Sequence, residues 1–243
     1  MKYLPWIFGP LTAAFLFSAA GSASAGLVTI DTSSNEYRSG LENQGWWPPT
    51  IGYSNNTDSD DHFVGWSTPG FSDTEVRSFF SFYLDPALLN NSTITGASFI
   101  IRKGESGGDG VQEAIGFFDV TSPLATVMHN VSSNFGVWTD LGTGMSYGTH
   151  TYATGGNPDE NLVIPLNAAA LAVMNAGFGS YFTMGAAITS GDGFIFRQNP
   201  GALGIQALLL ETTPVPEASA IALFVLALGM MAFWHAKIRV SGQ

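Results

Sequence analysis

Two pentads in the sequence match the Gly-x-Ser-x-Gly pattern that surrounds the nucleophilic serine of many hydrolases. They are Gly104–Gly108, centred on Ser106, and Gly144–Gly148, centred on Ser146. An active serine of this kind stands on a sharp turn between a strand and a helix, where backbone amides bind the oxyanion. Neither pentad is followed by a helical pattern, because more glycines follow the first and "THTYATGG" follows the second. In a chain with 29 glycines, we interpret both pentads as hairpin loops.

The sequence offers no evident base for either serine. His62, His129 and His150 are the histidines between the two ends of the chain, and no spacing ties them to a serine. A carboxylate pair such as Asp109 and Glu113 keeps a secreted hydrolase as one alternative. The pattern nevertheless favours a protein that is not an enzyme, and we expect no catalytic residues.

Acidic side chains gather in two places where a hard cation could bind. Asp58, Asp60 and Asp61 lie in "NNTDSDDH", and a second group surrounds the glycines of Glu105–Glu113. Carboxylate oxygens are the ligands that Ca²⁺ prefers, although neither group follows the spacing of an EF-hand loop. A solvated turn rich in Asp and Asn explains the first group equally well. We keep calcium at Asp58, Asp60 and Asp61 as a hypothesis and otherwise expect no cofactor.

Four tryptophans could serve as contact points for a ligand. Trp46, Trp47, Trp66 and Trp138 lie in segments rich in Gly and Pro, outside the predicted strands. An exposed indole can stack on a sugar ring or anchor a protein contact. The alternative is that these rings cap the ends of the core, because burying one ring removes a large apolar area from water. Both interpretations stay open for these candidate glycan-binding residues.

The span 26–213 must provide the scaffold, and its short apolar runs separated by turns are typical of strands. Glycine-rich turns such as "GESGGDG" and "SGDG" separate several of these runs, and "NAAALAVMNAG" alone predicts a helix, with Asn167 as N-cap. The pattern predicts an all-β fold, an antiparallel β-sandwich of jelly-roll-like type with one short helix. The predicted strands are Leu27–Ile30, Ser78–Leu84, Ala97–Arg102, Ala114–Val120, Leu162–Leu166, Tyr181–Ile188, Phe194–Arg197 and Gly204–Leu210.

One predicted strand lacks the usual alternation of apolar and polar residues. In "SFFSFYL" the aromatic residues Phe79, Phe80, Phe82 and Tyr83 fall on both faces. Such a strand is expected where both faces are covered or where it packs near the domain centre.

The charge of this span excludes some partners. All 19 acidic residues of the 243-residue chain lie between Asp31 and Glu217 together with only five basic residues, a net charge of −14 for that stretch. Nucleic acid is therefore not an expected partner. The content of 13% aromatic and 45% hydrophobic residues argues against a disordered acidic chain. Cysteine is absent, so that neither disulfides nor thiol chemistry contribute.

The first 25 residues have the features of a secretory signal peptide. Lys2 is followed by the apolar stretch "WIFGPLTAAFLF" and then by small residues that end in Ala23-Ser24-Ala25. This order predicts cleavage before Gly26 and export of the rest of the chain.

A second apolar segment lies near the other end. Residues 218–236 carry no Asp, Glu, Lys or Arg, and as a helix at about 1.5 Å per residue they would span about 28 Å, close to the thickness of a bilayer core. We expect a transmembrane helix here; a buried core helix is the alternative. Lys237 and Arg239 follow it, which places the acidic span outside the cytoplasm.

The C-terminal segment 214–243 combines a Pro-Glu element, an apolar helix and a basic end. This layout, with Val215, Pro216, Glu217, Lys237 and Arg239 as its polar landmarks, resembles the PEP-CTERM sorting signal of exported Gram-negative proteins. The resemblance implies recognition by exosortase, a membrane-embedded cysteine transpeptidase, and an association with exopolysaccharide and biofilm matrix. It differs from the usual family pattern in Ala218, where Pro is common, and in "HAKIRV", where an Arg-rich run is common.

We therefore expect three parts: a signal peptide (1–25), a β-sandwich ectodomain (26–213) and a sorting or anchor segment (214–243). The stretch from "GWW" to "RSFFSFYLDPALLNNSTITGASFII" also resembles β-sandwich domains of other exported PEP-CTERM proteins. The expected function is that of a surface or matrix protein without catalysis, held in the membrane or processed by exosortase. A carbohydrate-binding module and a secreted hydrolase are the alternatives.

Overall fold

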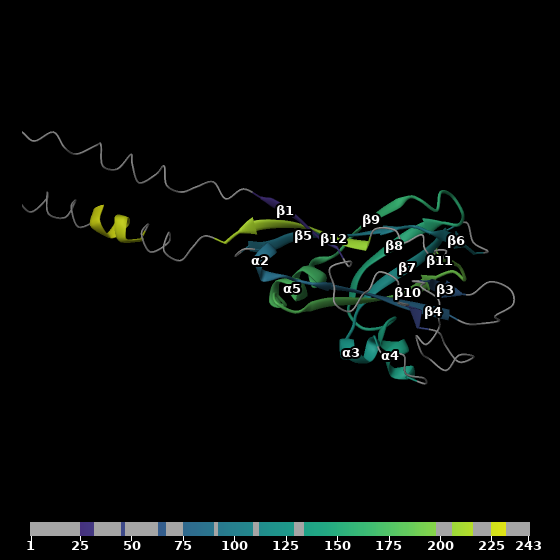
Figure 1. Ribbon diagram of the computed structural model, residues 1–243. Coiled ribbons are helices and arrows are strands. Elements are labelled where there is room, and N and C mark those ends of the chain that lie inside the picture. The colour runs from purple at the N-terminus through teal and green to yellow at the C-terminus, as the bar shows by residue number, and fades with distance from the viewer. Residues whose placement is uncertain are drawn as a thin grey trace, which may run out of the picture. The chain divides into compact units, whose positions relative to one another are not determined.

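The computed structural model describes residues 25–31, 45–46, 63–66, 75–89, 92–108, 112–128, 134–197, 206–215 and 225–231. The chain divides into two compact units, of which the larger is Gly26–Thr212, here called the sandwich domain. The other unit combines Met1–Ala25 with Thr213–Gln243. The elements of the sandwich domain are shown in Figure 1.

The strands are β1 (Gly26–Asp31), β2 (Gly45–Trp46), β3 (Val64–Trp66), β4 (Glu75–Tyr83), β5 (Ser92–Arg102), β6 (Glu105–Gly107), β7 (Gln112–Asp119), β8 (Ser146–Ala153), β9 (Asn161–Pro165), β10 (Tyr181–Ser190), β11 (Phe194–Arg197) and β12 (Gln206–Pro214). They form a four-stranded sheet, β1-β12-β5-β9, and an eight-stranded sheet, β6-β11-β3-β4-β10-β7-β8 with β2 paired to β4. The sheets are mostly antiparallel and pack on each other. The prediction of a β-sandwich-like, all-β fold is confirmed, and each of the eight predicted segments overlaps a strand.

Four phenylalanines join the two sheets. Phe99 of β5 extends from the four-stranded sheet toward three rings of the eight-stranded sheet. Its ring centroid lies 4.8 Å from that of Phe80, 5.9 Å from that of Phe82 and 5.7 Å from that of Phe117. All four rings are fully buried. Because burial of an aromatic side chain removes a large apolar area from water, this cluster is the centre of the main core.

The structure contains more helix than the sequence predicts. Helix α5 (Ala168–Ala176) lies where it was expected, and the Asn167 side chain caps it by accepting hydrogen bonds from two backbone amides. The short helices α2 (Pro86–Leu89), α3 (Leu124–Val127) and α4 (Phe135–Asp140) were not predicted. Their four to six residues are too few to show the 3.6-residue period of an amphipathic helix.

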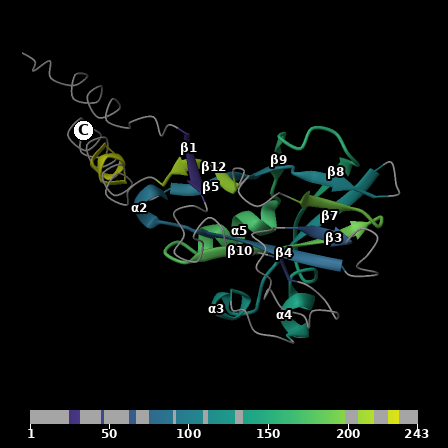
Figure 2. The ribbon, with the colours of Figure 1, turned by 45° about the vertical axis from the view of Figure 1, so that its right-hand side comes forward.

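Helices α3 and α4 cover the outer face of the eight-stranded sheet. Figures 1 and 2 both show them together on the side of β4 and β10 that faces away from β1, β5, β9 and β12. A second core fills the space beneath them, with Trp46, Phe79, Val127, Val137 and Leu141. Phe79 belongs to this second core, whereas Phe80 and Phe82 belong to the main one. Of the two situations expected for this strand, the structure shows the one in which apolar residues are buried on both faces.

The two ends of the sandwich domain lie side by side. Strands β1 and β12 pair in antiparallel register along the whole length of β1, so that Gly26 is opposite Thr212. The Thr212 hydroxyl donates a hydrogen bond to the Gly26 carbonyl at 3.3 Å. The first and last residues of the domain are therefore cross-strand neighbours.

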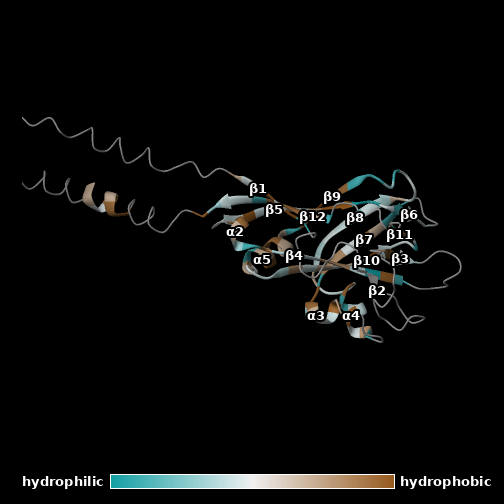
Figure 3. Cartoon of the chain, viewed as in Figure 1, coloured by the Kyte–Doolittle hydropathy of each residue, from teal (hydrophilic) through white to brown (hydrophobic). Residues whose placement is uncertain are grey.

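In the second unit, residues 225–231 form a helix with exposed apolar side chains. Val225, Leu226, Leu228, Met230 and Met231 are all exposed, and Figure 3 colours this helix as hydrophobic. Within the described residues, no helix has both the length and the apolar content needed to cross a bilayer. The rest of the predicted span 218–236 lies outside the described residues, as do residues 1–24 of the predicted signal peptide.

A buried carboxylate organises the glycine-rich loops at one end of the sandwich domain. The Glu113 residue is only 1% exposed, and its Oε2 accepts a hydrogen bond from the Gly193 amide at 3.3 Å. A Cβ atom on Gly108, Gly191 or Gly193 would overlap the Glu113 side chain. Burial, and then the charges of Glu113 and Asp192, raise the pKa of the Tyr152 phenol, which lies opposite Glu113 on β8. The loops therefore require glycine next to this carboxylate.

We expect Gly191→Ala to lower the free energy of unfolding by more than about 3 kcal/mol, because steric overlap with Glu113 adds to the strain of a left-handed backbone. Gly155→Ala is the matched control, since Gly155 has a similar positive φ of 74° but no neighbour within 4 Å of an added Cβ. It should cost about 1–2 kcal/mol. Urea unfolding monitored by tryptophan fluorescence measures both. Equal losses would show that the contact with Glu113 contributes nothing.

Candidate functional site

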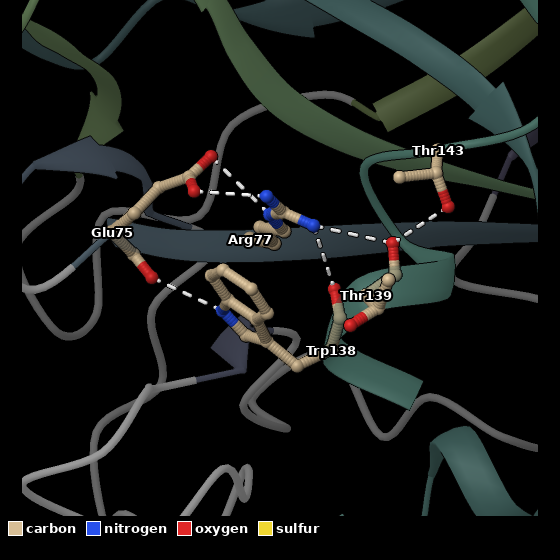
Figure 4. A network of polar contacts seen from close by, with 5 residues as sticks. All are labelled: Glu75, Arg77, Trp138, Thr139 and Thr143. Atoms are coloured by element: carbon tan, nitrogen blue, oxygen red, sulfur yellow. Dashed lines mark hydrogen bonds and ion pairs between the residues drawn. The ribbon is translucent and has the colours of Figure 1, made fainter. Parts of the chain in front are cut away.

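An arginine network connects strand β4 to helix α4 (Figure 4). The Arg77 guanidinium donates from Nε and Nη2 to the two carboxylate oxygens of Glu75, at 3.2 and 3.0 Å. Its Nη1 donates to the backbone carbonyls of Trp138 and Thr139, at 3.1 and 3.2 Å. Both charged side chains are mostly buried. The forked geometry of a guanidinium allows all four hydrogen bonds at once, which fixes α4 on the sheet.

The same network fixes the Trp138 ring. The Arg77 Cζ atom lies 3.7 Å from the centroid of the indole, a cation–π contact. The indole Nε1 donates to the Glu75 carbonyl at 3.1 Å. A Cβ atom at Gly142 would come within 2.6 Å of the guanidinium, so only glycine leaves Arg77 in this position. Trp138 is therefore a rigid ring, half-buried, with one face occupied by Arg77.

Two further aromatic residues near Glu75 and Trp138, Phe135 and Trp66, are partly exposed to solvent. The Phe135 side chain is 54% exposed, and its ring stacks with that of Trp138 at 5.9 Å between centroids and an interplanar angle of 20°. Trp66 is 36% exposed and lies opposite Glu75 in the ladder between β3 and β4. We call Phe135, Trp138 and Trp66 the aromatic surface. Phe135 was not among the predicted residues, although its spacing of three residues from Trp138 would place both on one face of a helix.

The four predicted tryptophans have different environments. Trp46 is fully buried in the second core, and its indole Nε1 donates to the Val127 carbonyl at 3.0 Å. The structure thus favours the core interpretation for Trp46, because no face of its ring is open to a sugar. Trp66 and Trp138 both neighbour Glu75, Trp66 across the ladder between β3 and β4 and Trp138 through a hydrogen bond to the Glu75 carbonyl. Trp47 lies outside the described residues.

Both pentads were predicted to be hairpin loops, and each lies partly in a strand and partly in the adjoining turn. Ser106 is in β6 and Ser146 begins β8, so neither stands between a strand and a helix. The Ser106 hydroxyl donates to the Gly155 carbonyl at 3.1 Å. Burial lowers the pKa of His150, which Glu160 raises in part and Lys103 lowers further. Among the described residues no hydrogen bond joins His150 to either serine; His62 and His129 lie outside them.

Of the acidic residues predicted as possible cation ligands, the structure describes Glu105 and Glu113, and it places them in different environments. Glu105 lies 3.9 Å from Arg197 in an exposed ion pair, whereas Glu113 is buried beneath the glycines. In the part of the chain that is described, no group of three or more Asp, Glu or His residues is placed to hold a metal ion. Asp109 and the predicted calcium ligands Asp58, Asp60 and Asp61 lie outside that part.

Of the predicted sorting residues, the structure describes Val215, which is exposed at the end of β12. Pro216, Glu217, Lys237 and Arg239 lie outside the described residues. No protein-family model and no curated protein matches the chain. Among the described residues, the aromatic surface is the candidate site considered below.

We expect Arg77→Lys to lower the free energy of unfolding by about 2 kcal/mol, because an ammonium cannot donate to Glu75 and to two carbonyls in this planar arrangement. The matched control is Arg102→Lys, which changes an ion pair with Asp159, whose side chain is mostly exposed. It should cost less than about 0.5 kcal/mol. Urea unfolding gives both values, and the fluorescence of Trp138 should shift only in Arg77→Lys. A loss at Arg77 no larger than that at Arg102 would contradict a structural role for the network.

Proposed function

We propose that the protein is an exported cell-surface or matrix protein without catalysis. In this proposal a jelly-roll-like β-sandwich ectodomain lies outside the cytoplasm, and a helix over about 218–236 holds it in the membrane. The observation that carries the proposal is the helix at 225–231, whose large apolar side chains are all exposed to solvent. Exposed apolar area costs about 25 cal/mol per Å² relative to a buried state, so this helix needs a cover such as lipid.

The C-terminal segment also suggests a partner. Val215, Pro216 and Glu217 precede the apolar helix, and Lys237 and Arg239 follow it, in the order of a PEP-CTERM sorting signal. An exosortase-type transpeptidase would cut this segment and release the ectodomain to the cell surface or to an exopolysaccharide-rich biofilm matrix. Without such processing the helix remains a single-span anchor.

We expect the double substitution Leu226→Asp with Leu228→Asp to move the protein from the membrane to the soluble exported fraction, because each Asp at the centre of a span costs about 2.5–3.5 kcal/mol. Val163→Asp, at an exposed apolar position in β9, is the control and should leave fractionation unchanged. Carbonate extraction of native-host membranes, with mass spectrometry of the C-terminus, measures both outcomes. An intact Gln243 indicates a permanent anchor, and a cut near Ala218 indicates processing. Unchanged membrane retention of the double variant would overturn the proposal.

One observation favours a second candidate function, binding of carbohydrate. The aromatic surface presents an exposed Phe135 ring, stacked on an indole that the Arg77 network holds in place. Rigid aromatic rings bind the apolar faces of ligands with little loss of conformational entropy. Such a module would hold the protein on exopolysaccharide.

We expect Phe135→Ala and Trp66→Ala each to weaken retention on exopolysaccharide from the native host about fivefold, which corresponds to about 1 kcal/mol per ring. Leu88→Ala is the control, because Leu88 is equally exposed but lies in α2. Affinity electrophoresis in gels that contain the polysaccharide measures the effect, and circular dichroism checks that the fold is retained. Equal migration of all three variants and the parent protein would exclude the aromatic surface as a glycan site.

A further inference from the structure

Large apolar side chains are exposed at one end of the sandwich domain, where β4 ends and β10 begins. Tyr83 is the last residue of β4 and is exposed, and its ring centroid lies 5.3 Å from that of Tyr181, its cross-strand neighbour on β10. Helix α2 follows β4 directly and exposes Leu88. Helix α5, which precedes β10, exposes Val173. This end therefore carries apolar area that the domain itself does not cover.

Contacts within the domain connect this end to its first and last strands. The Asn175 side chain of α5 donates to the Ile94 carbonyl of β5 at 2.9 Å. The next residue, Thr95, donates from its hydroxyl to the Glu211 carbonyl of β12 at 3.3 Å, and Glu211 lies opposite the exposed Leu27 of β1. Figures 1 and 2 both show α2 and α5 at the end where β1 begins and β12 ends.

The chain leaves the domain at the same end. Strand β12 ends at Pro214, and the predicted span begins at residue 218, so that only residues 215–217 connect them. Three residues reach at most about 11 Å even when fully extended. In the proposed function, a helix inserted over 218–236 therefore keeps this end of the domain close to the lipid surface.

The side chains at this end have the chemistry of a bilayer interface. Tyrosine is enriched at the boundary between membrane and water, and leucine enters the region between headgroups and acyl chains. Of the charged residues that the structure describes, Asp85 and Glu211 lie next to these side chains, and both are acidic. Insertion of apolar side chains, rather than attraction to anionic lipid, would therefore drive the contact.

We propose that Leu27, Tyr83, Leu88 and Val173, here called the apolar end, rest in the interface of the bilayer that holds the C-terminal helix. The inference rests on the proposed membrane anchor and names the lipid surface as a partner of the sandwich domain itself. The anchor supplies a high local concentration of lipid, so that even a small apolar contact is occupied. The domain then stands on the membrane in one orientation instead of turning freely about its short linker.

The test uses the absence of cysteine from the chain, because one introduced cysteine then carries a fluorescent label at a single known position. Leu88→Cys places the label at the apolar end, and Val163→Cys is the control, since Val163 is similarly exposed (58% against 54%) but lies in β9. The full-length labelled protein is reconstituted into phosphatidylcholine vesicles. Spin-labelled lipid should quench the label at position 88 at least about twofold more than that at position 163, because an inserted residue lies about 5–10 Å into the interface. Adding anionic phosphatidylglycerol should not increase the quenching.

Further substitutions separate insertion of the apolar end from an effect of the label itself. In the Leu88→Cys protein, the pair Leu27→Ser with Tyr83→Ser should lower quenching by lipid at least about twofold, because two inserted side chains are lost. Met145→Ser with Val163→Ser is the matched control and should leave the quenching unchanged, since both residues are exposed in other parts of the domain. Circular dichroism checks that the fold is retained in both pairs.

Flotation of the vesicles separates failure of this inference from failure of the proposed function. Protein that does not float with the lipid has no anchor, which overturns the proposed function and the inference with it. Floating protein in which lipid quenches the label at position 88 no more than that at position 163 overturns the inference alone. A label at position 88 that is shielded from iodide in the water but not quenched by lipid, and only at high protein-to-lipid ratios, overturns it in favour of contact between copies of the chain.

Discussion

The contact of Phe99 with Phe80, Phe82 and Phe117 is the interaction on which the other features of the sandwich domain depend. It places one ring from the four-stranded sheet among three rings of the eight-stranded sheet, all of them buried. Side chains that interdigitate in this way fix both the distance and the register between two sheets. Once this packing is fixed, β4 has its inner face filled, and its outer face is available to support a second layer.

That second layer explains why the aromatic surface is rigid. Phe79 and Trp46 pack beneath α3 and α4, and Arg77, two residues before Phe79, holds the end of α4 through its backbone carbonyls. A site on so short a helix would be mobile on its own, because helices of this length are unstable in isolation. Here the ion pair and the small core hold the Trp138 ring in place. In the proposed carbohydrate-binding function, a ligand that contacts this ring would therefore cause little loss of side-chain entropy. Burying the Arg77 guanidinium against the Trp138 ring costs desolvation energy, which its four hydrogen bonds offset.

Features that arise from residue periodicity were predictable from the sequence, whereas features that arise from tertiary contacts were not. Each of the eight predicted segments overlaps a strand because it contains a short apolar run. Strand β8 was missed because "SYGTHTYA" is an edge strand that buries only its two tyrosines. Helix α5 was predicted from its cap at Asn167, an interaction local in sequence. The structural role of Arg77 was not predicted, because its partners on α4 are 61 and 62 residues away in the sequence. Trp46 is buried whereas Trp66 is partly exposed, and the composition of the surrounding segments does not predict this difference.

The pairing of Gly26 with Thr212 has a consequence for how such a domain can be reused. A fold whose first and last residues are neighbours can be inserted into a loop of another polypeptide without stretching either partner, and it can be reopened elsewhere after its ends are joined by a short linker. The sandwich domain therefore has the geometry of a domain that tolerates insertion into another protein and circular permutation. Its original flanking segments could be exchanged for others while the packing between its sheets stays as it is.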